Sequence, residues 1–452
     1  MFILVAGHYF KDITALSSAR VVVLINQKNT NDRSARAAYF DACAKYYYSY
    51  LRRKKIKAKM VGTVSECKKY QSTGEAVHFY DPVNNNLEAD IKKTFPAAIM
   101  LETLGFINTK ADLLRFYKQN KTLRQTSFYI YSRKRLQILM DRSGKPIGGK
   151  YSYDSDNREK IKADDMGKIP SPGSVPTDHK SAEKWLDEFL RRKLKYFGKY
   201  QDAIVNTTSS KHIFLFHSGI SPMLNMGLLT PDYVIKRTLS YYKHNTRSIT
   251  INNIEGFIRQ IIGWREHCRL TYVVNYKEMR AANVLNGKIN VSNWGAAVIG
   301  VAPVDDAVKK MTEHGYLHHI ERLMIVGSFM LMMGANPDSA MKWFLHSGID
   351  AYEWNMLNNV KIMAMYAMGT KSYTTKPYIA SSNYILKMSN YKKDGHWELI
   401  WDALYWEFIR KNQSLIKHNP RLAIQIKLYK NKSKKQKMLY RTIKQKFLSG
   451  KY

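Results

Sequence analysis

Two adjacent histidines followed by an acid–base pair are the residues whose types and spacing most suggest chemistry. His318 and His319 lie in EHGYLHHIERLM (313–324), directly before Glu321 and Arg322. Successive side chains on a helix point about 100° apart, so at most one imidazole shares the main buried face. Arg322, four residues after His318, would lie on the same side as His318. A hydrogen-bonded histidine in the core is the plain alternative to a reactive pair.

A buried arginine at position 322 needs a carboxylate, because an uncompensated charge is costly to bury. Asp350, in LHSGIDAYEW (345–354), begins the next aromatic-rich segment and is the expected partner. The aromatic residues that crowd this part of the chain suit either core packing or electron transfer to a buried redox ring. They are Trp343, Tyr352, Trp354, Tyr366, Tyr373, Trp397, Trp401, Tyr405 and Trp406.

Two further stretches carry candidate binding groups. In FHSGISPMLNMGLLTP (216–231), Ser218 and Ser221 could hold a pyrophosphate at a turn that opens a helix, but a simple helix N-cap explains Ser221 as well and is favoured. In FIRQIIGWREHCR (257–269), Trp264 lies near several arginines and could stack on a base or an isoalloxazine ring. A core position for Trp264 is the safer interpretation of that residue alone.

The net charge of the chain indicates which kind of partner it binds. Lys and Arg number 73 against 36 Asp and Glu, which gives a formal charge of +37. An excess of this size favours a polyanionic partner, and nucleic acid fits best through neutralisation of its phosphates. A basic surface without such a partner is the alternative.

The three cysteines, Cys43, Cys67 and Cys268, are scattered and form no CxxC pair. This spacing argues against a disulfide framework and a four-thiolate metal site, and it indicates a reducing compartment. The apolar start MFILVAG (1–7) is too short to span a membrane and lacks a basic segment before it. We therefore expect no membrane association and a soluble, intracellular monomer, in the cytoplasm, nucleoid or nucleus.

The elements that must position these residues fall into two classes. Short β-branched runs predict parallel strands within 1–10, 20–27, 57–62, 75–82 and 96–103, with a helix over 39–59. Alternating strands and helices indicate a Rossmann-like α/β domain over 1–125. A Pro/Gly/Ser-rich crossing follows over 126–181.

Helical periodicity dominates residues 182–452, which we expect to form an all-α domain. Its first helix is predicted over 181–197, with Ser181 as N-cap. Helical patterns also cover 254–272, 319–335 and 396–411. The basic tail, with interleaved Tyr and Phe, predicts either a surface helix near phosphate or a solvated tail.

Several of these stretches together resemble one family, the photolyase-related proteins of the photolyase/cryptochrome superfamily, in the branch of the iron–sulfur bacterial photolyases. The similarity runs in order from about residue 1 to residue 425 and is strongest from residue 125 onward. The segments that carry it are FGKYQDA (197–203), RKRLQILMDRSGKPIGGKYSYDSDNR (133–158), FHSGISPMLNMGLL (216–229), FIRQIIGWRE (257–266), GYLHHIERLM (315–324), TKPYIASSNYILKMS (375–389) and WDALYWEFI (401–409).

The resemblance implies an N-terminal α/β domain and a C-terminal helical domain that holds FAD. The implied activity is light-driven reversal of pyrimidine dimers in UV-damaged DNA, with the lesion flipped out of the base stack. The segments that match the cofactor site contain His217, Ser218, Ile220, Ser221, Asn225, Gln260, Arg265, Arg322, Asp350 and Met368. Trp264, His318 and His319 match the lesion pocket, and the candidate electron-transfer residues are Trp343, Trp354 and Trp401.

The histidine pair bears on the kind of lesion. A (6-4) photoproduct needs a proton donor, and an imidazole has neutral and charged forms near pH 7. A cyclobutane dimer needs no such acid, so the pair favours (6-4) chemistry. Because a histidine can also simply hydrogen-bond the lesion, both substrates stay open.

Three departures from the family pattern change what the resemblance implies. Cysteines that hold an iron–sulfur cluster are missing from 300–310 and 390–401, so we expect no cluster and no metal. Met368, in AMYAMGTKS (364–372), replaces an acid close to the flavin. The acidic and His-Lys positions around a second chromophore are missing from 21–40, which argues against an antenna pigment.

Three functions follow from these observations. The first is an FAD-dependent DNA photolyase. The second, motivated by Met368, is a cryptochrome-like photoreceptor that binds flavin without repair. The third is a flavin-free DNA-binding relic, against which the retained Ser218, Arg265, Arg322 and Asp350 weigh.

Overall fold

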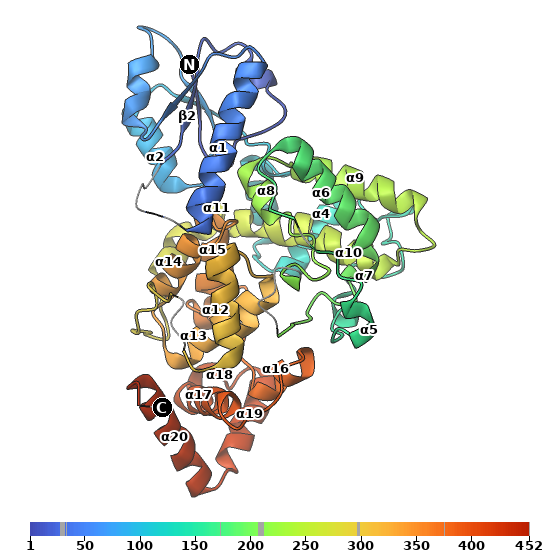
Figure 1. Cartoon of the computed structure of the whole chain (residues 1–452), viewed down its shortest axis with the longest axis vertical. Helices are drawn as coiled ribbons and strands as arrows, with labels where there is room; N and C mark the ends of the chain where they lie inside the picture. Colours follow the sequence, from blue (N-terminus) through green and yellow to red (C-terminus); the bar gives the residue numbers. More distant parts are fainter. Residues whose placement is uncertain are drawn as a thin grey trace.

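The computed structural model describes residues 1–27, 32, 34–171, 173–206, 212–295, 299–374 and 376–451. An α/β part forms one end of the molecule, and helices form the rest, with the C-terminal helices at the opposite end (Figure 1). Residues 28–31 and 33, within the segment that bears on an antenna pigment, lie outside the described residues.

The predicted strands form one parallel five-stranded sheet in the order β3-β2-β1-β4-β5. The α/β class expected from the sequence is therefore confirmed. The strand bounds are β1 Phe2–Leu4, β2 Val22–Ile25, β3 Ala58–Val61, β4 His78–Tyr80 and β5 Ile99–Leu101.

Strands β1 and β2 are buried on both faces, which explains their continuous apolar sequence. Alternate residues point to opposite faces. Phe2 and Leu4 belong to a core shared with α1 (Ala35–Arg53), whereas Ile3 joins a core shared with α2 (Asn85–Thr94). The two helices flank the sheet in Figure 1.

Two predicted helix starts are corrected by the capping geometry. Helix α1 begins at Ala35 rather than residue 39, because the Ser34 hydroxyl accepts a hydrogen bond from the Ala37 N–H. It ends at Arg53, and Ala58 already belongs to β3. The helix predicted from Ser181 is α6 (His179–Arg192), and Asp178 rather than Ser181 is its N-cap.

The segment that joins the two parts contains short helices as well as turns. It holds α4 (Gln125–Leu136), η3 (Asp154–Asp156) and α5 (Ala163–Met166), and α4 packs against the π-helical segment η5 (Arg259–Arg265). The crossing therefore lies against the helical part.

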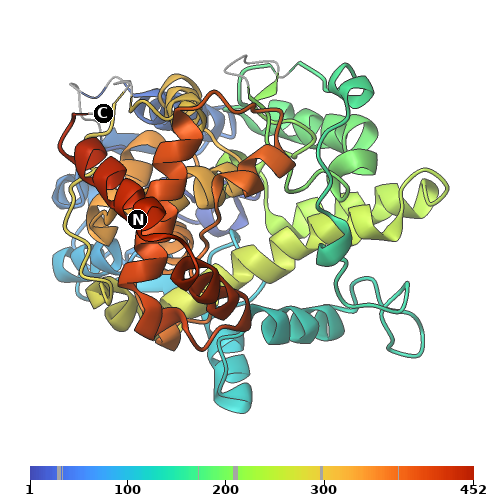
Figure 2. The ribbon, with the colours of Figure 1, turned by 90° about the horizontal axis from the view of Figure 1, so that it is seen from below.

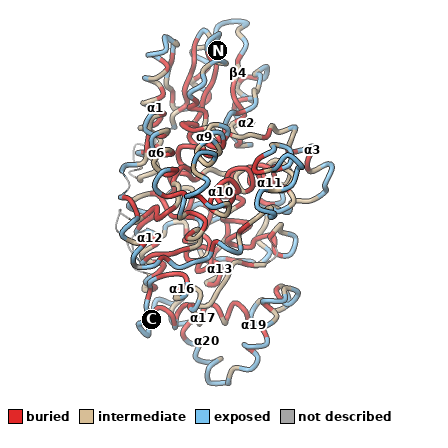
Figure 3. Tube along the Cα trace, turned by 90° about the vertical axis from the view of Figure 1, so that its right-hand side faces the viewer, coloured by how far each residue is buried: buried red, intermediate tan, exposed pale blue. Residues whose placement is uncertain are grey.

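The remaining elements are helices that surround two large apolar cores, and the buried trace runs through the middle of the molecule (Figure 3). Their bounds are η1 Thr14–Leu16, η2 Ser65–Tyr70, α3 Lys110–Asn120, α7 Leu194–Phe197, α8 Ser221–Met226, α9 Pro231–His244, α10 Ile251–Ile258, α11 Glu266–Ala281, α12 Ala302–His314, η6 Glu321–Gly327, α13 Ser328–Met333, α14 Pro337–Ser347, α15 Glu353–Met356, η7 Leu357–Ala364, η8 Gly369–Lys371, α16 Ser382–Met388, α17 Trp397–Lys411, α18 Gln413–Ile416, α19 Pro420–Lys430 and α20 Lys434–Leu448. Among the described residues, no helix is long and apolar enough to cross a membrane.

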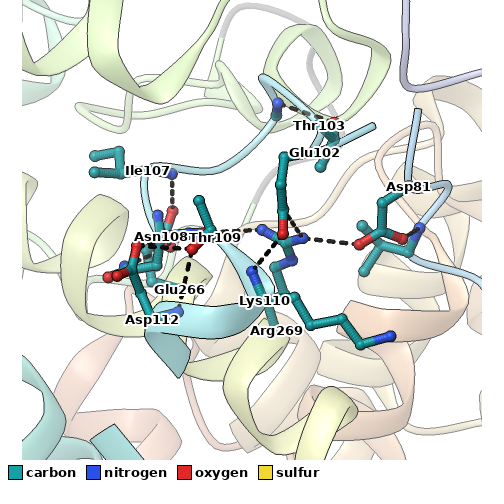
Figure 4. A network of polar contacts seen from close by, with 12 residues as sticks. Asp81, Glu102, Thr103, Ile107, Asn108, Thr109, Lys110, Asp112, Glu266 and Arg269 are labelled. Carbon is teal, nitrogen blue, oxygen red and sulfur yellow. Dashed lines mark hydrogen bonds and ion pairs between the residues drawn. The ribbon is translucent and has the colours of Figure 1, made fainter. Parts of the chain in front are cut away.

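A buried polar network on α11 fastens the sheet to the helical part (Figure 4). Glu266 accepts hydrogen bonds from the backbone N–H groups of Ile107 (2.8 Å) and Asn108 (3.1 Å). Arg269, which is fully buried, forms an ion pair with Asp81 at 2.8 Å and donates to the Asn108 carbonyl at 2.6 Å. These contacts fix the orientation of the sheet on the helices, because each charge is satisfied only in this arrangement.

Replacing Arg269 by methionine should therefore destabilise the whole protein. Arg269→Met leaves the Asp81 carboxylate buried without its counter-charge, and we expect the free energy of unfolding to fall by about 3–5 kcal/mol. Urea denaturation followed by circular dichroism measures this change.

Arg115→Met is the matched control, because Arg115 is 61% exposed and its ion pair with Asp112 lies at the surface. The control should change the free energy of unfolding by about 1 kcal/mol or less. An equally small effect of Arg269→Met would show that the network does not join the two parts.

Candidate functional site

A cavity of about 260 Å³ lies in the helical part, and three π-helical segments contribute to its wall. Gln260 and Trp264 come from η5, Arg322 and Leu323 from η6, and Ala364 from η7. A π-helical turn widens the helix and shifts its side chains, and such turns are frequent at functional sites. Their convergence on one cavity marks it as the candidate site.

The ion pair predicted between Arg322 and Asp350 is present in the cavity wall. Arg322 Nη1 lies 2.9 Å from Asp350 Oδ1, and Arg322 Nη2 donates to Asp350 Oδ2 at 3.1 Å. Ser221 Oγ donates to the same Oδ2 at 2.7 Å. The Ser221 hydroxyl therefore holds the carboxylate, and the N-cap of α8 is Ile220, so the N-cap expected at Ser221 is wrong.

The two histidines sit at the start of η6 and not inside a long helix. Helix α12 stops at Gly315, whose φ of +63° favours glycine and where a Cβ would lie 2.6 Å from Ile349. The chain then passes along the cavity wall, and His318 and His319 follow before η6 begins.

The two imidazoles have different surroundings. His318 is 2% exposed, and its ring stacks on His217 with ring centres 4.6 Å apart. Burial, followed by the charges of His217 and Lys310, lowers the pKa of His318 well below its usual value. The expectation that both forms are accessible near pH 7 is therefore wrong for His318, which is neutral there.

His319 is exposed and lines the cavity, 6.4 Å from Trp264 between ring centres. The surrounding protein atoms and the charge of Arg322 lower its pKa to about 4. Contact with water acts in the opposite direction, because water stabilises the charged form. Of the pair, His319 is the imidazole that can exchange a proton with a bound molecule.

A second buried ion pair, between Lys310 and Glu321, lies next to the His318 imidazole. Lys310 Nζ lies 2.5 Å from Glu321 Oε1 and also donates to the Val205 carbonyl at 3.2 Å. The other Glu321 oxygen is 3.4 Å from His318 Nε2, although neither ring nitrogen of His318 has a hydrogen-bond partner among the described residues. Glu321 therefore provides a fixed negative charge beside the imidazole.

Arg265 is a cation without a carboxylate partner among the described residues. Its guanidinium donates to Asn225 Oδ1 and to the Gly105 carbonyl, and it lies 4.9 Å from the centre of the Trp354 ring. Burial lowers its pKa to about 10, so it stays charged at neutral pH. An uncompensated cation in a cavity wall favours an anionic ligand.

The cavity brings together most of the residues that the sequence singled out. Those that line it are His217, Ser218, Ile220, Ser221, Asn225, Gln260, Trp264, Arg265, His318, His319, Arg322, Asp350 and Trp354.

Three predicted residues lie elsewhere. Met368 is buried in the large apolar core and does not line the cavity, because the chain turns away after Ala364. Trp343 and Trp401 are also buried in that core, where their indole N–H groups donate to the Trp294 and Ala380 carbonyls. The assignment of Met368 to the cofactor site stays a prediction.

Sequence reasoning missed several polar residues of the cavity wall. Asn355 donates to the Asp350 carbonyl at 3.0 Å, Asn359 lines the wall one turn later, and Gln201 has a buried side-chain oxygen without a partner. Asn355 and Asn359, four residues apart in WNMLNNVKIMA (354–364), were the available signal. The Lys310–Glu321 pair had no such signal, because its members lie on different helices.

Residues 300–310 and 390–401, where iron–sulfur family members carry cluster-binding cysteines, lie next to each other in the structure. Tyr391 donates to Asp306 Oδ2 at 2.6 Å, and Val301 and Trp397 are buried in the same core. Within the described residues, no group of three or more His, Cys, Asp or Glu is placed to hold a metal ion. The residues present at this place therefore do not fit an iron–sulfur cluster, which needs thiolate ligands.

Asp350→Ala tests the central ion pair. The change leaves Arg322 without its counter-charge. Its guanidinium keeps a hydrogen bond from Nε to the Leu317 carbonyl at 2.7 Å and a contact with the Tyr316 ring at 5.5 Å. We expect the free energy of unfolding to fall by about 3–5 kcal/mol in a urea titration.

Asp232→Ala removes a carboxylate that is 63% exposed and paired with Lys236 at the surface. This control should change the free energy of unfolding by about 1 kcal/mol or less. Equal effects of the two substitutions would show that the Arg322–Asp350 pair does not stabilise the site.

The sequence of the chain is similar to proteins of one known family. Residues 16–204 match the family model described as deoxyribodipyrimidine photo-lyase-related protein. A (6-4) photolyase of Agrobacterium fabrum is 31% identical over 360 residues, which are 70% of this chain and 68% of that protein.

Solved structures show the same fold. A class III photolyase from Agrobacterium tumefaciens aligns with a TM-score of 0.62 at 16% identity, over 99% of this chain and 96% of that chain. A cryptochrome from Synechocystis aligns with a TM-score of 0.61 at 12% identity, over 94% of this chain and 89% of that chain. The chain therefore belongs to the photolyase-related family, in the branch of the photolyase/cryptochrome superfamily that contains the iron–sulfur bacterial photolyases.

Proposed function

We propose that this protein is a light-dependent DNA photolyase that binds FAD in the cavity and reverses a pyrimidine dimer in UV-damaged DNA. The observation that carries the proposal is the convergence of the histidine pair, Trp264 and the Arg322–Asp350 ion pair on one cavity. The similarity to a (6-4) photolyase over most of the chain supports it.

The cavity residues fit FAD by their unused polar groups. Arg265 carries a charge that no carboxylate of the described residues neutralises, which suits a phosphate. His217 Nδ1 and Gln201 Oε1 are buried and lack hydrogen-bond partners among the described residues. Buried polar atoms are normally satisfied, so these atoms are available to a ligand.

When bound in its reduced form, FAD supplies an electron to the dimer on light absorption and receives it back, so that the reaction has no net oxidation. The protein side chains then have distinct tasks. Arg322, held by Asp350, keeps a positive charge in the wall of the site, and Trp264 offers a flat surface on which a base can stack.

We assign the proton transfer to His319, because it is exposed to the cavity whereas His318 is buried. Both imidazoles have a lowered pKa, and negative charge on a bound lesion raises the pKa of the one that faces it. His319 would donate a proton to an oxygen of the lesion as negative charge develops there and would recover it when the bases separate. His318, beside Glu321, orients the lesion by hydrogen bonding. A proton donor is needed for a (6-4) photoproduct, which is our favoured substrate.

The observation that favoured a non-repairing photoreceptor was Met368 in place of an acid near the flavin. Met368 lies in the large apolar core and does not line the cavity, which weakens this argument. No other feature of the described residues favours the photoreceptor or the flavin-free relic over the photolyase.

The main test is repair of defined lesions under blue light. We expect the flavin-loaded protein to repair (6-4) photoproducts and His319→Ala to lower the repair rate by about 100-fold or more, because general acids contribute about 10²–10⁴ to rates. Product formation is followed by chromatography of lesion-containing oligonucleotides.

His244→Ala is a suitable control, since His244 is exposed on α9 and outside the cavity wall. The control should repair at the wild-type rate. If the flavin-loaded wild-type protein repairs neither (6-4) photoproducts nor cyclobutane dimers, the proposed function is wrong.

Binding of damaged DNA should depend strongly on salt. With a net charge of +37, the protein is expected to neutralise several phosphates, so the logarithm of the binding constant should fall steeply and linearly with the logarithm of salt concentration. Fluorescence anisotropy with a labelled duplex measures the slope. A flat response would rule out phosphate contacts as the main source of affinity.

A further inference from the structure

A second, larger cavity of about 670 Å³ lies near the C-terminal end of the molecule. It is enclosed by the turn 283–289, the end of α13, the end of α17 and the C-terminal helix α20. Helix α20 packs along α17, and the C-terminal helices lie in front of the other elements in Figure 2. The two cavities share no lining residue.

The turn that closes one side of this cavity is held firmly. The Lys288 and Ile289 N–H groups both donate to the Gly334 carbonyl, at 3.0 and 3.2 Å. A Cβ at Gly287 would lie 2.1 Å from the Ala335 carbonyl oxygen, so only glycine allows this close approach. The wall is therefore a preformed part of the fold.

The cavity has an apolar floor and a basic rim. Its floor contains the buried side chains of Leu331, Met332, Met365 and Phe408. Its rim carries the exposed cations Lys288, Lys411 and Arg441. A ligand that fits both would be apolar at one end and anionic at the other.

The rim charges are not neutralised by the protein. The single acid of the wall, Glu407, is already bound by Arg410 through contacts of 2.9–3.0 Å. Within the described residues, no ion pair involves Lys288, Lys411 or Arg441. Such an accumulation of like charge around a hollow attracts a polyvalent anion.

Lys444 adds a partly buried cation between floor and rim. Its Nζ donates only to the Met332 carbonyl, at 3.2 Å, and no carboxylate of the described residues forms an ion pair with it. Burial lowers its pKa to about 8. Glu407 is near enough to raise this pKa but forms no ion pair with Lys444, so the partly buried ammonium gains from a bound phosphate.

We propose that this second cavity binds a nucleoside polyphosphate, with the phosphates on Lys288, Lys411, Arg441 and Lys444 and the base on the apolar floor. These four cations form no ion pair within the described residues and match the charge of a di- or triphosphate. The floor contains Met332 and Met365, which suit a flat ring, since methionine adapts to aromatic surfaces. Phosphates of a DNA strand share the rim chemistry, but they do not need an enclosed apolar floor.

The second cavity and the candidate active site are lined by residues that follow each other in the sequence. Ala364 lines the first cavity and Met365 lines the second, at the end of η7. A ligand in the second cavity therefore contacts the same turn that forms part of the active-site wall.

The proposal is tested by isothermal titration calorimetry of the full chain with ATP. We expect Lys444→Met combined with Arg441→Met to weaken ATP binding by about tenfold or more, because each substitution removes a charge-assisted hydrogen bond to a phosphate. The matched control is Lys434→Met with Lys435→Met, which removes the same charge from exposed positions of α20 outside the cavity. Circular dichroism verifies that both variants are folded.

Two further probes separate the sources of phosphate. Inorganic tripolyphosphate should bind more weakly than ATP, and a short single-stranded oligonucleotide should not compete with ATP for this cavity. If tripolyphosphate binds as tightly as ATP, the nucleoside is not recognised. If only the oligonucleotide binds, or both double variants behave alike, the proposal is overturned.

The pH dependence gives an independent check on Lys444. Its neighbours are Glu407, Arg410 and Lys411 on α17, Arg441 on its own helix, and Lys288 on the turn. Because the pKa of Lys444 is about 8, ATP binding should weaken between about pH 7 and pH 9 as this charge is lost. Lys444→Met alone should remove most of this change, and an unchanged pH profile in that variant would contradict the role of Lys444.

Discussion

The carboxylate of Asp350 is the contact on which the candidate site depends. It joins Arg322 of η6 to Ser221 of α8, and the backbone carbonyl of the same residue accepts hydrogen bonds from Asn225 and Asn355. Segments that are far apart in the sequence therefore meet at one residue. Because the charges are almost fully buried, they are stable only while all partners stay in place.

The three π-helical segments explain how so many polar side chains reach one cavity. An ordinary helix directs a given face inward at every third or fourth position, which would place apolar residues at most of these points. The wider turns of η5, η6 and η7 shift the register, so that Gln260, Arg322 and Asn359 line the cavity while neighbouring residues fill the cores. The site thus uses irregular helix geometry that the packed cores hold in place.

Burial divides the histidine pair into two roles. Since His318 is 2% exposed and stacked on His217, water cannot stabilise its charged form. His319 retains contact with water in the cavity. The Glu321 carboxylate, paired with Lys310, places a negative charge next to His318 while His318 stays buried. Two identical neighbours in the sequence therefore differ in their access to water and to a bound molecule.

At the start of α11, the network around Arg269 and Glu266 fixes the sheet on the helical part. The basic second cavity lies away from this junction, near the C-terminal helices. Part of the net charge of +37 comes from cations that surround this cavity and its apolar floor. The cations are brought together because α20 packs on α17.

The sequence by itself determined the five strands, the helical second part and the Arg322–Asp350 pair, because hydrophobic periodicity and the cost of a buried charge are local or pairwise constraints. It also identified most residues of the cavity wall through their motifs. The position of Met368 in the core and the missed Lys310–Glu321 pair share a cause, since both depend on how separate helices pack. Whether a side chain faces a cavity or a core, and whether an imidazole is buried or exposed, was decided only by the tertiary structure, because burial results from contacts between segments that the sequence does not order in space.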